Sequence, residues 1–460
     1  MKVLRTISPV NGEVYVERPY ATPAEVEAAL DRAKKAQADW KYTPLDQRAE
    51  ILSRAVDAFV GRTDVIAEEL SWQMGRPIKY APGEVRGFEE RARMMIRLAT
   101  DSLADVRVSE KEGFNRFIRR EPLGTVLTMA AWNYPYLIAV NSVWPALMAG
   151  NAVVLKHSSQ TPLCGERMGE ALAEAGLPDG LYQNLFLSHS LTADVVKDSR
   201  VDFVAFTGSV EGGQSVHEAG GGTFKAIGLE LGGKDPAYVR GDADLAQAIE
   251  NLVDGAFFNS GQSCCGIERI YVHQSLFDDF VDGCVSLVNK YTLGNPLDKD
   301  VTLGPVVRTS AAKWIRGQID EAIAAGAKPL IDSSNFALDN RDGPHMAPQV
   351  LVNVDHTMKV MMEETFGPVV GIMPVETDEQ AIELMNDSPY GLTASVWTKD
   401  EEAALHIGDR VDTGTWFMNR CDYLDPELAW VGVKDSGRGC TLSHVGYEHL
   451  TRPKSFHVRR

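Results

Sequence analysis

Short apolar segments alternate with helix-forming stretches along most of this chain, and that alternation restricts the fold more than any other feature. Runs that are apolar throughout, rather than at every second residue, suit strands buried on both faces of a parallel sheet. Beyond Thr125 the gaps between such runs are long enough for crossover helices. The pattern predicts an α/β fold with a doubly wound parallel sheet, with strands in segments 125–132, 152–158, 182–187, 203–209 and 224–233.

A second series of the same kind begins near Asp242 and predicts a second doubly wound, Rossmann-like domain. Its strands are expected in segments 268–273, 369–375, 392–398 and 414–419. Segments 114–122 and 454–460 have strand character but lie outside both series. Exposed strand edges need partners, so we expect these two segments to form a small β flap that joins subunits in a homodimer or homotetramer.

These patterns divide the chain into three expected units. The first hundred residues are mainly of helical pattern, after a helix start signal at Thr22-Pro23. We expect a cofactor-binding domain at 1–104 and 123–232, a catalytic domain at 233–448, and an oligomerisation flap at 105–122 and 449–460.

Composition excludes several classes of partner. The formal net charge is −18, from 64 acidic and 46 basic residues, and this sign repels nucleic acid and anionic membranes. No stretch approaches the ~18 apolar residues of a membrane span, and the N-terminus does not resemble a signal peptide. The 6 cysteines are sparse and lack CxxC spacing, so we expect no metal site and a cytoplasmic location.

Candidate catalytic groups occur at the ends of predicted strands. Cys264 lies in GQSCCGIER (261–269) just before a strand, although a lone cysteine is more often a small buried hydrophobe. Glu230, in LELGGKDP, ends an apolar strand, where a buried carboxylate is costly unless it has partners. Asn133, in WNYP, follows the end of another strand.

Together these segments resemble a known family. Asn133 in WNYP, Glu230 in ELGGK, Cys264 in GQSC and the segment ETFGP (364–368) resemble, in order and spacing, the signature segments of the aldehyde dehydrogenase superfamily. The resemblance runs from about Ile7 to the C-terminus. It implies an NAD(P)-dependent enzyme that oxidises an aldehyde to a carboxylic acid, of the hydrolytic, non-acylating type.

The resemblance also implies the chemistry of each catalytic residue. Cys264 attacks the aldehyde carbon, because a thiolate is a strong nucleophile. The side-chain amide of Asn133 and the backbone N–H of Cys264 stabilise the resulting oxyanion. Glu230 is the general base that activates water to hydrolyse the thioester, and an apolar environment would raise its pKa toward the working pH. Its presence favours hydrolysis over transfer to coenzyme A.

The dinucleotide fingerprint GxGxxG is absent, but FTGSVEGG (206–213) offers a helix N-terminus at Gly208-Ser209 for a pyrophosphate. By the resemblance, the other cofactor contacts come from single side chains. Lys156 contacts the adenosine ribose and Glu364 the nicotinamide ribose, with Phe366 beside it. The remaining expected cofactor-binding residues are Trp132, at the boundary with the substrate, and Leu231.

Ser159 marks a departure from NAD-selective relatives, which usually carry glutamate at this position. A glutamate there would bind both ribose hydroxyls and repel a 2′-phosphate, whereas serine does neither. We therefore expect that NADP is accepted as well as NAD.

The substrate is less well determined by the sequence. Trp430 stands where the family segment usually has Pro-Phe-Gly-Gly, and it suggests a medium-sized pocket with aromatic walls. Arg420 could bind the carboxylate of a semialdehyde acid, but we favour an ion pair between Arg420 and Asp422 or Asp425 of its own loop. The expected pocket residues are Tyr136, Ser263, Cys265, Leu424 and Trp430.

Three alternatives remain open at this stage. A coenzyme A-acylating dehydrogenase would use the same nucleophile. A thioesterase or esterase could use Cys264, Asn133 and Glu230 without a cofactor. A non-catalytic structural relative would tend to lose the nucleophile, which this chain retains.

Overall fold

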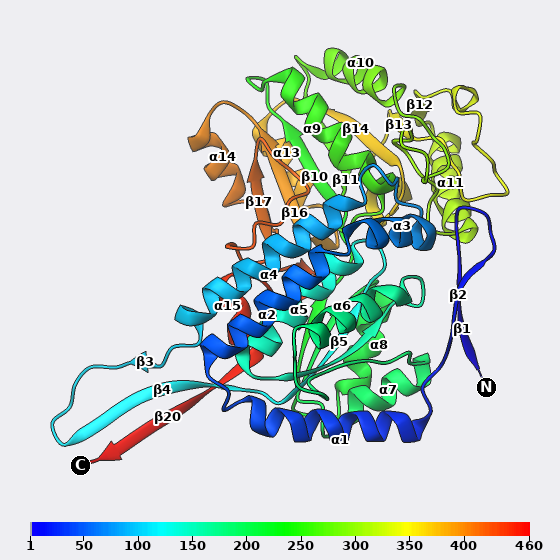
Figure 1. Ribbon diagram of the computed structural model, residues 1–460. Coiled ribbons are helices and arrows are strands. Elements are labelled where there is room, and N and C mark those ends of the chain that lie inside the picture. Colours follow the sequence, from blue (N-terminus) through cyan, green and yellow to red (C-terminus); the bar gives the residue numbers. More distant parts are fainter. Residues whose placement is uncertain (1) are drawn as a thin grey trace.

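The apolar runs that begin at Thr125 form one sheet of six strands (Figure 1). The structure, a computed structural model, describes residues 2–460. The strands β5 to β9 are parallel, and the short β19 adds to the edge of β9 in the antiparallel sense. In spatial order they are β19 (Gly437–Arg438), β9 (Ala226–Glu230), β8 (Phe203–Thr207), β5 (Thr125–Ala130), β6 (Ala152–His157) and β7 (Tyr182–Asn184).

Helices cover this first sheet, and their apolar sides join its strands in one large core. α1 begins where the sequence predicts, because Thr22 and Glu25 form a capping box. These helices are α1 (Pro23–Trp40), α2 (Leu45–Val60), α3 (Thr63–Met74), α4 (Pro82–Ser102), α5 (Pro135–Ala149), α6 (Pro162–Glu174), α7 (His189–Lys197) and α8 (Val210–Gly220).

A second sheet of seven strands forms the other lobe, at the top of Figure 1. All of its strands are parallel except β12 at one edge. In spatial order they are β12 (Lys328–Pro329), β13 (Gln349–Val352), β14 (Val369–Val375), β11 (Ile267–His273), β10 (Asp235–Val239), β16 (Thr393–Trp397) and β17 (Thr415–Met418). The expected α/β fold with two largely parallel sheets is therefore confirmed.

The helical segments of the second lobe lie between these strands in the chain. They are α9 (Leu245–Phe257), η1 (Phe258–Gly261), α10 (Phe277–Val288), α11 (Thr309–Ala324), η2 (Ser333–Asn335), α12 (Lys359–Met362), α13 (Asp378–Asn386) and α14 (Glu401–Gly408). No helix among the described residues has both the length and the apolar character needed to cross a bilayer.

Three smaller β elements complete the structure. β4 (Phe114–Pro122) pairs with β20 (Thr451–Arg459) and with β3 (Val106–Arg107), and this flap projects away from the body of the molecule (Figure 1). The two segments that we expected as isolated strands thus pair with each other. The other elements are a hairpin of β1 (Val3–Ile7) and β2 (Val14–Pro19), the pair β15 (Tyr390–Gly391) and β18 (Val433–Lys434), α15 (Ser443–Gly446) and η3 (Tyr447–Leu450).

The candidate site lies where the two lobes meet. The carboxyl ends of β5, β8 and β9 carry the segments of Asn133, Ser209 and Glu230. Cys264 and Glu364 instead precede the amino ends of β11 and β14 in the second sheet. The first sheet follows the usual rule that ligands bind at the carboxyl ends of strands. The second sheet contributes residues at the amino ends of its strands instead.

Candidate active site

Cys264 lies on the turn between η1 and β11 and borders two cavities. One cavity also contains Asn133 and Ser209, and the other also contains Glu230 and Trp430. The Cys264 side chain is half-buried, as a nucleophile open to a substrate must be. Cys264 is thus the point at which the two cavities meet.

Asn133 is held by its backbone, which leaves its side chain available. Its carbonyl oxygen accepts hydrogen bonds from Arg76 Nη2 (2.5 Å) and Asn259 Nδ2 (3.2 Å). Arg76 forms an ion pair with Glu84 in the interior, and Glu84 Oε1 also accepts the backbone N–H of Tyr136 at 2.9 Å. Within residues 2–460, the Asn133 side-chain amide has no hydrogen-bond partner, so its N–H donors are free for a ligand.

Arg76 and Glu84 did not emerge from the sequence as site residues. Both are polar residues of a helical region, and a charged residue there is usually solvated. Their separation of eight residues along the chain spans the end of one helix and the start of the next. A buried salt bridge of this kind is visible only once the helices are packed.

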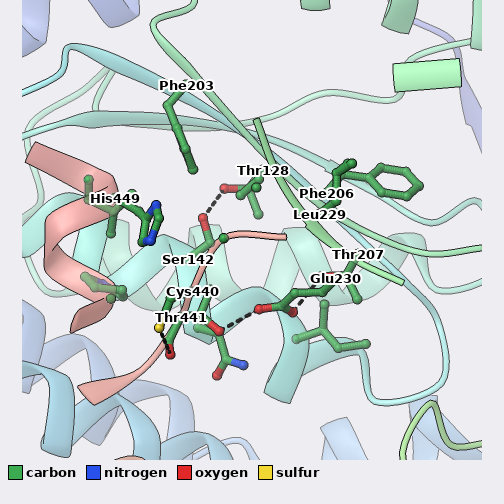
Figure 2. A pocket seen from close by; sticks show the side chains of 18 of the residues that line it. Thr128, Ser142, Phe203, Phe206, Thr207, Leu229, Glu230, Cys440, Thr441 and His449 are labelled. Carbon is green, nitrogen blue, oxygen red and sulfur yellow. Dashed lines mark hydrogen bonds between the residues drawn. The ribbon is translucent and has the colours of Figure 1, made fainter. Parts of the chain in front are cut away.

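Glu230 is held by two threonine hydroxyls (Figure 2). Its Oε1 accepts from Thr441 Oγ1 at 2.5 Å, and its Oε2 accepts from Thr207 Oγ1 at 3.0 Å. Burial raises the pKa of Glu230, while these two hydrogen bonds and the charge of Arg91 lower it. The pKa shift is upward, in the direction expected for a general base that works near neutral pH.

Glu230 also borders a second, small cavity, which Cys264 does not line. This cavity of about 30 Å³ includes Ser142, Thr441 and His449 (Figure 2). It has room for about two water molecules. Glu230 therefore lines both the pocket that contains Cys264 and this small, mostly apolar chamber, and sequence reasoning did not identify the chamber.

The first of the two cavities that meet at Cys264 has a volume of about 340 Å³. Ser209 caps α8 through its hydroxyl, which accepts the N–H of Gly212 at 3.2 Å. The rings of Trp132 and Phe366 meet edge to face, with centroids 5.6 Å apart. Most of the expected cofactor residues line this cavity, namely Trp132, Gly208, Ser209, Leu231, Glu364 and Phe366.

Glu364 points its carboxylate toward the backbone of the ELGGK segment, where Oε1 accepts the N–H of Gly233 at 3.0 Å. Burial, and next the negative charge of Glu268, raise the pKa of Glu364 to about 8. Glu268 holds the same loop: it forms a buried ion pair with Lys234 and accepts the backbone N–H of Phe366 at 2.9 Å. The Lys234–Glu268 pair is a second buried element that the sequence did not reveal.

Lys156 and Ser159 do not line that cavity in the structure. Lys156 is near the carboxyl end of β6, opposite Met129 of β5, and burial lowers its pKa. Ser159 follows the strand, and its carbonyl accepts the Thr6 hydroxyl at 2.7 Å. Their expected contacts with the adenosine half of a cofactor stay predictions.

The other cavity at Cys264 has a volume of about 420 Å³ and contains most of the expected substrate-pocket residues. Ser263, Cys265, Leu424 and Trp430 line it.

The prediction for Tyr136 is wrong. This residue is fully buried, with its ring 4.9 Å from that of Phe59, and it belongs to the core. Because α5 begins at Pro135, Tyr136 is already in the first helical turn on the inner face, and Tyr134, just before the helix, lines the pocket instead.

The pocket wall beside Cys264 is polar. Asp422 Oδ1 accepts from Ser263 Oγ at 3.1 Å and from Cys265 Sγ at 3.0 Å. Burial raises the pKa of Asp422 to about 7. The hydroxyl of Tyr134 is buried without a hydrogen-bond partner among the described residues.

Arg420 does not behave as we expected. Its guanidinium stacks on the ring of Tyr423 at 3.5 Å from the centroid, the side chain is exposed, and it does not line the substrate pocket. Within residues 2–460 it forms no ion pair with Asp422 or Asp425, so the pairing that we favoured is wrong as well. The arginines that do line the pocket are Arg86 and Arg91.

Comparison with known proteins agrees with this geometry. Residues 1–456 match the model of the aldehyde dehydrogenase family. The chain is 34% identical over 457 residues, 98% of its length and 99% of the relative's, to succinate-semialdehyde dehydrogenase [NADP(+)] 1 of Mycobacterium tuberculosis. It is 33% identical to the succinate semialdehyde dehydrogenase [NAD(P)+] of Escherichia coli, with 96% of this chain and 95% of that protein covered.

A solved structure is also similar over its whole length. The succinic semialdehyde dehydrogenase of Streptococcus pyogenes, crystallised with NADP+, superposes with a TM-score of 0.94 at 29% identity, covering 99% of this chain and 100% of that one. The chain therefore belongs to the aldehyde dehydrogenase family, as an oxidoreductase that oxidises an aldehyde with NAD or NADP.

Proposed function

We propose that Cys264 is the nucleophile of this enzyme and that Asn133 and Glu230 complete its catalytic set. The observation that carries the proposal is the position of Cys264 at the meeting point of two cavities. One cavity is lined by the residues expected to hold a dinucleotide, and the other is a pocket of a size suited to a small aldehyde. A sulfur atom reached from both sides can hold a substrate against a cofactor.

The first step follows from the free amide of Asn133. The Cys264 thiolate forms a C–S bond to the aldehyde carbon, and the carbonyl oxygen takes the negative charge. The Asn133 side chain, fixed through its own carbonyl by Arg76 and Asn259, offers an N–H to that oxygen. A donor held in place before the reaction stabilises the developing charge without reorganisation.

The residues of the 340 Å³ cavity fit a nicotinamide dinucleotide. The start of α8 at Gly208-Ser209 supplies backbone N–H groups for a pyrophosphate, and the Glu364 carboxylate can accept ribose hydroxyls. Trp132 and Phe366 form an aromatic wall for a flat ring. When bound, the oxidised cofactor supplies the acceptor for the hydride that the aldehyde carbon loses, and Cys264 is left as a thioester.

Glu230 would then serve the hydrolytic step. Its carboxylate takes a proton from a water molecule, the oxygen of that water bonds to the thioester carbon, and the C–S bond breaks to release the acid and the Cys264 thiolate. The raised pKa of Glu230 supports this role. Because Thr441 and Thr207 now hold the carboxyl, a side-chain rotation toward Cys264 would precede the step.

We infer that NADP is used at least as well as NAD. Ser159 carries no charge that would repel a 2′-phosphate. The relatives in Mycobacterium tuberculosis and Escherichia coli are named as NADP(+)- and NAD(P)+-dependent.

For the substrate, we infer a short aldehyde with a terminal carboxylate, since both curated relatives are named for succinate semialdehyde. The test is NADPH formation with a panel of aliphatic, aromatic, ω-amino and ω-carboxy aldehydes, with wild-type protein and Cys264→Ala. We expect activity with the wild type that Cys264→Ala lacks. Nucleotide reduction by Cys264→Ala at the native rate would contradict the proposal.

Coenzyme A transfer is the second candidate reaction, because the same thioester could react with a thiol instead of water. Analysing the product with and without coenzyme A separates the two reactions. Subunit association through the flap, the cytoplasmic location and the division into domains at residues 104, 123, 232 and 448 stay predictions. One feature bears on that division: β19 (Gly437–Arg438), within the expected second domain, pairs with β9 of the first sheet.

A further inference from the structure

Arg91 is a buried arginine in the wall of the substrate pocket. Its side chain, on α4, is only 8% exposed, yet it borders the same cavity as Cys264. Two other buried cations near the site, Arg76 and Lys234, each form an ion pair with a glutamate. Arg91 has no carboxylate within ion-pair distance among residues 2–460, which is unusual because buried charges are normally paired.

The hydrogen bonds of Arg91 leave one side of the guanidinium unused. Its Nη1 donates to the carbonyl oxygen of Leu137 at 2.9 Å and to Asn141 Oδ1 at 3.3 Å, both on α5. Its Nε and Nη2 donate to no group of the described chain, and neither belongs to the fully enclosed polar atoms that lack a partner. These two nitrogens are therefore reachable from the pocket. They form one edge of the guanidinium, which can bind both oxygens of a carboxylate.

The other charged groups of the pocket are differently placed. Glu90 accepts the hydroxyl of Tyr423 at 3.0 Å, and Asp422 accepts from Ser263 and Cys265. Arg86 and Asp254 line the same cavity with exposed side chains. Among the described residues, Arg91 is thus the buried cation that lines this pocket, and its Nε and Nη2 donate no hydrogen bond.

We propose that Arg91 binds the terminal carboxylate of the substrate through Nε and Nη2 and so sets the specificity for ω-carboxy aldehydes. This inference rests on the proposed function, because it assigns a residue to the far end of the substrate whose aldehyde reacts at Cys264. Asn141 is a positioning residue: its side-chain oxygen holds Nη1 and fixes the plane of the guanidinium. The role that we weighed for Arg420 in the sequence passes to Arg91.

The experiment compares two aldehydes with the same carbon skeleton, succinic semialdehyde and butanal. Arg91→Met is expected to lower kcat/KM for succinic semialdehyde by about 100-fold, mainly through KM, because an unpaired substrate carboxylate is strongly rejected. For butanal the same variant should stay within about threefold of the wild type. Arg91→Lys should recover part of the loss. The matched control is Arg97→Met, which removes an arginine of the same helix that is 65% exposed and does not line the pocket, and it should leave the ratio of the two substrates unchanged.

Three outcomes overturn the assignment of Arg91. Equal losses for both aldehydes would show that Arg91 acts on structure or on the reacting atoms. An unchanged ratio would show that the carboxylate lies elsewhere. A wild-type preference for 4-aminobutanal would show that the acidic groups of the pocket select a cation. By contrast, a wild type that reduces neither NAD nor NADP with any aldehyde would refute the proposed function itself.

A second measurement needs no variant and applies if Arg91→Met fails to fold. In the wild type, 4-hydroxybutanoate keeps the carboxylate but has no aldehyde, and 1,4-butanediol has neither. We expect competitive inhibition by 4-hydroxybutanoate at concentrations at which butanediol has no effect. Equal effects of the two compounds would overturn the proposal.

Discussion

The hydroxyl of Thr441 donates a 2.5 Å hydrogen bond to Oε1 of Glu230, on the side of the carboxyl that faces the small chamber. This bond stabilises the charged carboxylate and lowers the pKa of Glu230 against the larger upward effect of burial. It joins residues 211 positions apart in the chain. The C-terminal segment therefore lowers the proton affinity that burial gives to the proposed base.

Thr441→Val should raise the pKa of Glu230, because it removes a hydrogen bond to the charged form. Since a base must be unprotonated to act, the acidic limb of the kcat–pH profile should move to higher pH, by about one unit. Thr441→Ser keeps the hydroxyl and serves as the control, with a profile close to the wild type. A limb that stays in place in Thr441→Val would show that Glu230 is not the group that titrates.

Glu230→Gln should separate the two halves of the reaction. The glutamine cannot accept the proton of water, so the thioester should accumulate after one turnover. Rapid mixing should show a burst of about one NADPH per subunit, followed by a steady state about 100-fold or more below the wild type. A full steady-state rate without a burst would point to another base.

Asn133→Ala should lower kcat by about 10²–10³-fold, the usual effect of losing one oxyanion donor. Its side chain has no partner in the folded chain, so thermal unfolding should change little. Activity and the unfolding temperature are measured on the same preparation. A large loss of stability would show that the amide has a structural role instead.

Arg76→Met should destabilise the fold, because it leaves the buried Glu84 without its counter-charge. Breaking such a pair costs about 3–5 kcal/mol of unfolding free energy. The control is Arg5→Met, since the Arg5–Glu17 pair is exposed (59% and 50%) and contributes little. Chemical denaturation gives both values, and similar results for the two variants would contradict this account of the interior.

Ser159→Glu should reduce the use of NADP. A carboxylate at this position would repel the 2′-phosphate and accept the ribose hydroxyls of NAD. We expect kcat/KM for NADP to fall more than about tenfold while the value for NAD rises or stays level. Ser159→Gln, of similar size but without charge, is the control. No change in the ratio would place the ribose away from this residue.

The sequence pointed to the candidate residues that are encoded locally, and their catalytic roles stay predictions. Asn133, Glu230 and Cys264 each belong to a short segment at the end of a strand or turn, and the sheet topology brings such ends together. Segments 114–122 and 454–460 were also visible as strand-forming, and the second of the observed strands begins earlier, at Thr451. In these cases the local pattern and the tertiary structure agree.

What the sequence could not supply depends on packing between distant segments. The hydrogen bond from Thr441 forms only when the C-terminal segment lies beside β9, and the buried pair of Arg76 and Glu84 forms only when the turn after α3 packs against α4. Tyr136 shows how sensitive such predictions are: the helix starts one residue before it, and that start turns its ring into the core. The sequence pointed to Arg420 and missed Arg91 for the same reason. No local pattern distinguishes a solvated helical arginine from one that lines a pocket.

The pairing of β19 with β9 has a consequence for biosynthesis. During translation, Cys264 and Glu230 leave the ribosome long before Trp430 and Thr441 have been made. Until that late stretch docks, the pocket lacks a wall and the acid lacks one of its two hydroxyl partners. A nascent chain therefore carries its reactive sulfur without a finished site around it until the segment of Trp430 and Thr441 has been made and has docked.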